Sequence, residues 1–333
     1  MTKYLNLQLF AELNTNTTGT DTLSAENKEF YDKQLIRLAK PNLIHDQFGQ
    51  KRPIPKNGGK KIEFRKFASL PKALTPLTEG VTPDGKKLSV TSIEAEVAQY
   101  GDYIVQSDVL ELTTIDNTIV EATKILGRQA GLTLDTITRN IMQSGTNVFY
   151  APKADGTAVT SRAGLDTTCV LTVDLVNRAV AWLKKNNAPK INGDYVAIIH
   201  PYVAYDLMND ERWIDAHKYA TPENIYNGEL GKIGGVRFIE SSEAKVYEGG
   251  VFGCLFLADG AYGVTEITGG GLETIIKQKG SAGTADPLDQ RSSIGWKAIK
   301  TAEILVEQYL VRVECKSALS ENFPKDDQDL EAN

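Results

Sequence analysis

The sequence predicts an α+β protein, and three observations carry this prediction. Apolar residues recur at steps of three and four over residues 115–144, which is the pattern of a long helix with one buried face. Two runs within residues 60–105 alternate apolar and polar side chains, as the strands of a hairpin do. Further helix and strand patterns mix over residues 165–315. The long helix would measure about 45 Å, against about 50 Å for a compact sphere of this chain length, so we expect an elongated or flat body.

The composition is that of a folded protein with a sizeable core. Of the 333 residues, 41% are hydrophobic and 24% are charged, which excludes wholesale disorder. Lys and Arg number 37 and Asp and Glu number 43, so the formal net charge of −6 does not favour a protein that grips nucleic acid. No apolar stretch approaches the roughly 18 residues of a membrane span. Three widely spaced cysteines indicate a reducing compartment without a disulfide framework.

The amino-terminal residues 1–58 are predicted to form an arm, not a domain. They contain a polar, low-complexity segment and then a helix pattern that begins at Ser24 and ends before Pro41. Seven Lys or Arg and one Glu follow between Lys51 and Lys66. We interpret this basic cluster as a contact for an acidic surface. The acidic segment from Glu321 of a neighbouring copy is favoured over nucleic acid, and a solvated arm is the remaining alternative.

The hairpin of residues 60–105 is the strongest indication of self-assembly. Its strands are joined by residues 71–87, whose three prolines and two glycines prevent regular structure. A change in the apolar alternation near Ser92 is interpreted as a β-bulge. A two-stranded hairpin is marginal in water by itself, so its apolar coat needs a partner. We therefore expect the hairpin and the arm to lie on adjacent copies of the chain.

The rest of the chain is predicted as alternating helices and strands. Gly145 is placed to end the long helix. Further helices are expected at residues 172–187 and 201–208, and strands at residues 195–199, 236–239, 251–257, 264–268, 272–277, 294–299 and 304–315.

The sequence contains no pattern of a known catalytic or cofactor site. Residues 58–61, Gly-Gly-Lys-Lys, lack the first glycine and the Ser or Thr of a phosphate-binding loop and are predicted to form a turn. None of His45, His200 and His217 has a second His or a Cys at the spacing of zinc ligands, and His200 is interpreted as a structural residue. We therefore expect no catalytic residue, no metal and no cofactor, and we do not expect an enzyme.

Several short strings, taken in their order along the chain, resemble one protein family. They are residues 48–55 (FGQKRPIP), 76–81 (PLTEGV), 99–101 (QYG), 194–201 (DYVAIIHP) and 231–236 (GKIGGV), and the resemblance as a whole covers about residues 25–316. The opening string at residues 6–11 (NLQLFA) is similar to the starts of structural proteins from phages of Gram-positive hosts. The chain as a whole resembles the major capsid protein of tailed bacteriophages, which has the Hong Kong 97-type fold.

The resemblance implies a layout for the chain. The implied parts are an amino-terminal arm (1–58), an extended loop (59–105), a peripheral domain with its spine helix (106–164), an axial domain (165–290), strands that return to the peripheral domain (291–320) and an acidic tail (321–333). The core face of the spine helix would include Ile119, Leu126, Leu134 and Ile137. The arm and the extended loop would contact neighbouring subunits through Arg52, Phe64, Phe67, Leu70, Leu74, Leu77, Glu79 and Val81.

The implied function is an icosahedral shell around a double-stranded DNA genome. The expected partners are further copies of the chain in pentamers and hexamers, scaffolding, portal and decoration proteins, and packaged DNA held only non-specifically, with no membrane. The expected location is the virion capsid, assembled in the host bacterial cytoplasm. Two alternatives stay open at this point: an encapsulin-like nanocompartment shell, and a soluble α/β enzyme whose hairpin is an active-site lid.

Overall fold

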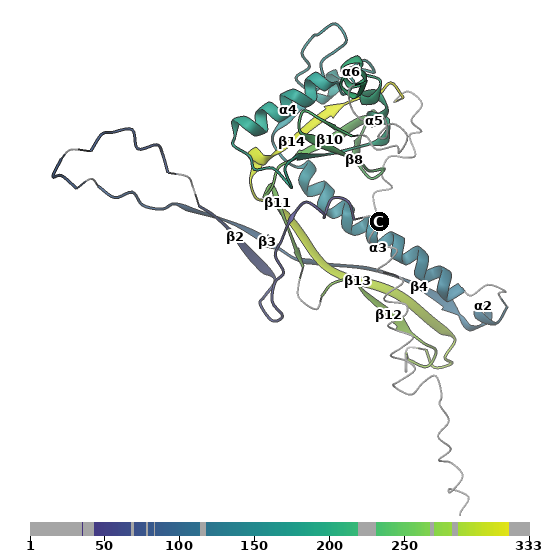
Figure 1. Cartoon of the computed structure of the whole chain (residues 1–333). Coiled ribbons are helices and arrows are strands. Elements are labelled where there is room, and N and C mark those ends of the chain that lie inside the picture. The colour runs from purple at the N-terminus through teal and green to yellow at the C-terminus, as the bar shows by residue number, and fades with distance from the viewer. Residues whose placement is uncertain are drawn as a thin grey trace, which may run out of the picture. The chain divides into compact units, whose positions relative to one another are not determined.

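Figure 1 shows the computed structural model of the chain. It describes Leu35 and residues 43–319, except residues 68–69, 78, 83, 114–117, 219–230, 267–269 and 282–285. The predicted helix from Ser24 and the acidic tail from Glu321 lie outside the described residues. The chain divides into two compact units. The first unit comprises residues 1–40, 101–130 and 272–297, and the second comprises residues 41–100, 131–271 and 298–333.

A seven-stranded mixed sheet forms the centre of the second unit. Its order is β5-β14-β10-β6-β8-β7, with β9 also paired to β10. Both β6 and β10 are buried at every position, as expected for central strands covered on both faces. The strands are β5 (Val148–Tyr150), β6 (Tyr195–Ile199), β7 (Lys232–Ile233), β8 (Val236–Glu240), β9 (Val246–Tyr247), β10 (Val251–Leu257) and β14 (Leu310–Cys315).

Two apolar cores lie on the two faces of this sheet. Alternate residues of β6 divide between them, with Ala197 in one core and Ile198 in the other. The first core includes residues of α4 (Val173–Lys185), α5 (Pro201–Met208) and α6 (Glu211–Lys218). The second core includes Met142 from the end of the long helix together with Tyr262 and Val264. The period of two along β6 thus fixes which elements cover each face.

Side-chain caps fix where α4 and α5 begin. The Thr172 hydroxyl accepts a hydrogen bond from the Leu175 amide, which confirms the helix start predicted at that residue. His200 is the N-cap of α5, and its Nδ1 accepts from the Tyr202 amide at 3.1 Å. Burial lowers the pKa of His200 to about 4, so the ring stays neutral and can accept. His200 is therefore a structural residue, as its position after a buried strand predicts.

The long helix α3 (Thr118–Gln143) begins in the first unit and ends in the second. Its 26 residues span about 39 Å. Residues 114–117 lie outside the described part, so the predicted start at residue 115 is untested. In the second unit, the side-chain Nε2 of Gln143 donates to the Gly253 carbonyl at 2.7 Å, and the Arg139 guanidinium donates to the Glu243 carbonyl at 2.7 Å. These bonds attach the end of α3 to the sheet and to the segment before β9.

A second ladder is built on the long strand β13 (Arg291–Ile304). In the second unit, residues 300–304 of β13 pair with β11 (Tyr262–Glu266), which also pairs with the short β1 (Gln50–Lys51). In the first unit, residues 293–297 of β13 pair with β12 (Glu273–Lys277). Two separate strands are present where residues 294–299 and 304–315 were predicted, but the predicted position of the break between them was wrong. The break lies later, because the amides of Leu305 and Val306 both donate to the Ala261 carbonyl and residues 307–309 form a 3-10 turn.

In the first unit, β4 (Ala98–Ser107) also pairs with β13 and leads into α2 (Asp108–Thr113). Glycines allow a close approach of these strands, since a Cβ at Gly101 would meet the Trp296 carbonyl oxygen at 2.5 Å. The Trp296 indole donates to Gln129 at 3.2 Å, and Gln129 donates to Asp102 at 2.6 Å. A short 3-10 turn in the second unit (Arg162–Gly164) completes the described elements. Among the helices described, none has the length and apolar character that crossing a membrane requires.

The hairpin consists of β2 (Lys61–Phe67) and β3 (Val90–Glu96) in the second unit. The register is continuous, with Phe64 opposite Ile93 and Arg65 opposite Ser92, so the predicted bulge near Ser92 was wrong. The alternation changes because the two apolar runs of the return strand face opposite sides. Ile93 and Ala95 share the face of Phe64, whereas Val90 lies on the other face and is exposed.

Candidate assembly interface

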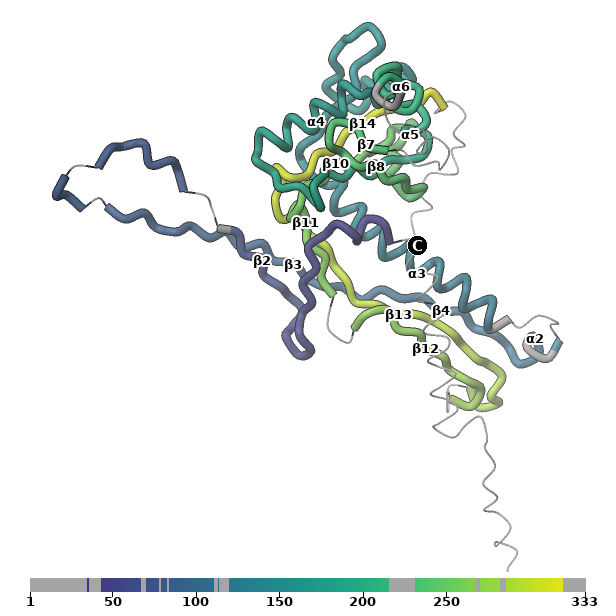
Figure 2. The backbone as a smooth tube through the Cα atoms, in the orientation of Figure 1, coloured from purple at the N-terminus to yellow at the C-terminus, as the bar shows by residue number. Residues whose placement is uncertain are grey.

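Among the described residues, the loop that joins β2 to β3 is not covered by other parts of the chain. Every described residue from Leu70 to Ser92 is exposed. The predicted contact residues in the loop are among them, with exposed fractions of 53% for Leu70, 82% for Leu74, 77% for Leu77 and 62% for Val81. Figure 2 follows the backbone from β2 through this loop and back to β3. A run of apolar side chains left in water on one segment is typical of a surface that binds another protein.

Two further predicted contact residues, Phe64 and Arg52, lie at the base of the hairpin, and they differ in their exposure to solvent. Phe64 is 4% exposed because its ring packs against Gly263 of β11, so this chain itself covers it. Arg52 is exposed, and its guanidinium carbon lies 5.8 Å from the centre of the Phe64 ring. Glu79 is exposed in the loop, and Phe67 pairs with Val90 in the ladder, although its side chain lies outside the described part.

The segment before the hairpin is attached to α3 and β13 by buried polar contacts. The His45 amide donates to Asp135 at 2.8 Å, and Nδ1 of the His45 ring lies 2.6 Å from the other Asp135 oxygen. The Thr138 hydroxyl donates to Asp46 at 2.6 Å. The Lys300 ammonium donates to both Asp46 and the Leu134 carbonyl. This buried cluster was not predicted from the sequence. The one signal for it in the sequence is a pair of polar residues, Asp135 and Thr138, on the apolar face of the long helix.

The predicted core residues of the long helix fall into three groups. Leu126 is 1% exposed in the first unit, and Leu134 is 6% exposed in the second. Ile137 is partly buried. The side chain of Ile119 lies outside the described part.

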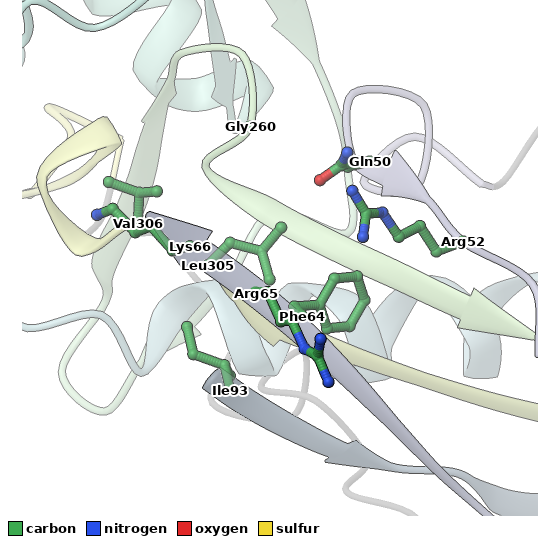
Figure 3. A pocket seen from close by; sticks show the side chains of 9 residues that line it. All are labelled: Gln50, Arg52, Phe64, Arg65, Lys66, Ile93, Gly260, Leu305 and Val306. Atoms are coloured by element: carbon green, nitrogen blue, oxygen red, sulfur yellow. The ribbon is translucent and has the colours of Figure 1, made fainter. Parts of the chain in front are cut away.

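An apolar pocket with a basic rim lies at the base of the hairpin in the second unit. Its volume is about 140 Å³, and Figure 3 shows the side chains that line it. Phe64, Ile93 and Leu305 supply apolar walls, and the cations are Arg52, Arg65 and Lys66. Within the described residues, no three or more His, Cys, Asp or Glu side chains are grouped so as to hold a metal ion.

A family model described as a phage capsid protein matches residues 90–309. The chain belongs to this phage capsid protein family. The matched residues run from β3 to the 3-10 turn before β14 and so include α3, most of the seven-stranded sheet and β13. No curated protein matches the sequence. The protein is a phage major capsid protein, and its place is the shell of the virion.

Solved structures agree on the fold. The capsid of cyanophage P-SCSP1u matches with a TM-score of 0.65 at 14% identity, over 83% of this chain and 88% of that chain. The capsid of cyanophage Pam1 matches with a TM-score of 0.66 at 13% identity, over 84% of this chain and 92% of that chain. The SrpI encapsulin of Synechococcus elongatus matches with a TM-score of 0.54 at 10% identity, over 85% and 90% of the two chains.

These matches confirm the predicted α+β class as the mixed α+β fold of phage capsid proteins. Because the chain belongs to a family of phage capsid proteins, we identify it as a subunit of an oligomeric shell. Family membership also disfavours the alternative of a soluble enzyme with a hairpin lid.

Proposed function

We propose that the capsid protein builds an icosahedral shell around a double-stranded DNA genome by laying its β2–β3 hairpin on a neighbouring subunit. One observation supports this above all others: every described residue between Leu70 and Ser92 is exposed, including four leucines. A two-stranded hairpin is marginal in water by itself, and among the described residues only those at its base are covered by the rest of the chain. A neighbouring copy supplies the missing cover.

The energetics favour many modest contacts. Burying one leucine fully contributes about 1.5–3 kcal/mol, so the four exposed leucines Leu70, Leu74, Leu77 and Leu88 make the loop a substantial part of an interface. Each subunit of a closed shell is held by several neighbours at once, and linked contacts reinforce one another without any single strong one. The loop therefore needs only moderate affinity for its neighbour.

The Hong Kong 97-type layout is the detailed form of this proposal. In it, residues 1–58 are the arm, residues 59–105 the extended loop and α3 the spine helix. The peripheral domain is made of residues 106–164 and 291–320, and residues 165–290 form an axial domain at five-fold and six-fold axes. The order of elements along the chain supports this assignment, with the hairpin before the long helix and the helix before the large sheet.

The proposed partners follow from the same layout. Pentamers and hexamers of the chain would assemble in the host cytoplasm with scaffolding and portal proteins, and decoration proteins would bind the finished shell. The net charge of −6 supports a shell that holds DNA only non-specifically. Tight binding of duplex DNA by purified shells at physiological salt would contradict this part.

The test replaces Leu70–Lys87 with a short Gly-Ser turn. Because every described residue in this range is exposed, the variant should fold with the helix content of the wild type by circular dichroism. Electron micrographs should show shells for the wild type and none for the variant. Normal shells from the variant would refute the role of the loop.

An encapsulin-like nanocompartment is the second candidate, favoured by the structural match to the SrpI encapsulin. The fold does not separate the two, because both kinds of shell share it. Particles purified from expressing cells distinguish them: a cargo enzyme inside the particles would favour the nanocompartment, and particles without one would favour the viral shell.

A further inference from the structure

The pocket at the hairpin base combines apolar walls with three cations, two of which pair with no described carboxylate. Phe64, from β2, and Leu305, from the segment after β13, are among its apolar walls (Figure 3). Arg65 already donates to Glu63 at 3.1 Å. Among the described residues, by contrast, no carboxylate pairs with Arg52 or Lys66. The pocket therefore suits an apolar side chain flanked by acidic ones.

The sequence of this chain contains one segment with that chemistry. Between residues 321 and 331 there are five acidic residues and one lysine, and a single aromatic residue, Phe323, lies among them. The opposing basic cluster of residues 51–66 has seven Lys or Arg and one Glu. Complementary charge steers association and fixes register, while a buried aromatic anchor supplies affinity.

The direction of β14 favours a neighbouring copy over the same chain as the source of the segment. Leu310 pairs with Leu257, so β14 begins near the turn at Gly260 that borders the pocket, and Cys315 pairs with Phe252 at the far end of β10. Figure 1 shows the carboxyl end of β14 directed away from β11. Along β14 the chain moves about 17 Å away from the end that borders the pocket. Phe323 is four residues after Leu319, the last described residue, and so lies at most about 14 Å from it. The described chain is thus led away from its own pocket, which favours a second copy as the donor of Phe323.

We propose that this pocket binds the acidic segment, residues 321–331, of a neighbouring subunit, with Phe323 against the apolar walls and the carboxylates against Arg52 and Lys66. The inference rests on the proposed function, because a shell brings the copies together. It gives the shell a contact separate from the loop, one that charge controls and that salt weakens.

The test uses a fluorescent peptide of residues 320–333 and full-length subunits in their unassembled state. Fluorescence anisotropy should show saturable binding that weakens in raised salt. Changing Phe323→Ser in the peptide or Lys66→Glu in the subunit should each weaken binding about tenfold. The matched control is Lys184→Glu on α4, an exposed lysine outside the pocket, which should leave binding unchanged.

Absence of saturable binding, or equal binding by the Lys66→Glu and Lys184→Glu subunits, would overturn the inference. The outcome is separable from that of the loop replacement. If the loop is required for shells but the peptide does not bind, the proposed function stands and this contact falls. If the loop is dispensable, the peptide measurement still decides whether the pocket binds the segment.

Discussion

Gly263 lies directly under the ring of Phe64: a Cβ on Gly263 would come within 2.9 Å of two ring carbons. This contact joins β11, in the body of the second unit, to β2 of the hairpin. Ala95 and Val97, farther along the return strand, are also buried. The base of the hairpin is therefore fixed to its own subunit, while the loop beyond it is exposed. In the proposed assembly, that division would let one subunit present the loop to another in a defined direction.

The first prediction concerns this contact. Gly263→Ala should lower the free energy of unfolding by about 1–3 kcal/mol, because ring or strand must shift to admit the methyl group. Gly271→Ala is the matched control, since a Cβ there meets nothing within 4 Å, and it should change stability by less than about 0.5 kcal/mol. Urea denaturation measures both. Equal stability of the two variants would show that Phe64 does not depend on Gly263.

The second prediction concerns the buried ion pair of Lys300 and Asp46. Lys300→Met leaves the Asp46 carboxylate buried without its cation, which should cost about 3–5 kcal/mol. Lys297→Met removes an exposed pair with Glu273 and should cost about 1 kcal/mol or less. Thermal and urea unfolding compare the two. A small effect at Lys300 would mean that the buried pair does not hold the segment around Asp46 in place.

A third prediction tests the buried face of α3. Leu126 is 1% exposed and its neighbour Ile125 is 63% exposed, so the two residues present the same helix turn to different surroundings. Leu126→Asp places a carboxylate in the core at a cost of several kcal/mol, and the subunit should fail to fold. Ile125→Asp should remain soluble with native circular dichroism. If Ile125→Asp prevents folding and Leu126→Asp does not, the buried face of α3 has been assigned wrongly.

The fourth prediction is a pH dependence. Burial lowers the pKa of His200 from 6.5 to about 4, so the folded state favours the neutral ring. Its contribution to stability is fully present above about pH 6.5 and is lost as the pH falls from there towards about 4. At pH 5 the loss should be on the order of 1–2 kcal/mol.

The His200→Asn variant keeps an N-cap acceptor and lacks the titrating ring. Denaturant titrations between pH 7 and pH 5 should therefore give a shallower loss of stability for the variant, whatever its stability at pH 7. Parallel pH profiles for the two proteins would mean that His200 is not responsible.

Elements buried in a regular pattern could be predicted from the sequence with accurate bounds. β6, β10 and α5 occupy the predicted residues because a run of buried side chains or a proline at the helix start marks their ends locally. The start of α4 is also marked locally, by its N-cap residue Thr172.

The failures have a common physical cause, which is dependence on distant residues. The end of β13 depends on the Ala261 carbonyl, and the face of Val90 depends on the register with β2; neither is encoded within a few residues. The cluster of His45, Asp46 and Lys300 joins positions up to 254 residues apart in the sequence, so no local pattern reveals it. Phe64 was predicted as an intersubunit contact, and its burial follows from the absence of a side chain at Gly263.

The central claim is that a neighbouring subunit covers the loop between β2 and β3. Electron cryo-microscopy of shells assembled from the purified chain tests it most directly. The predicted result is a loop that lies against a second copy, with the side chains of Leu74 and Leu77 excluded from solvent. A closed shell in which residues 70–88 contact no other copy and stay in solvent would contradict the account.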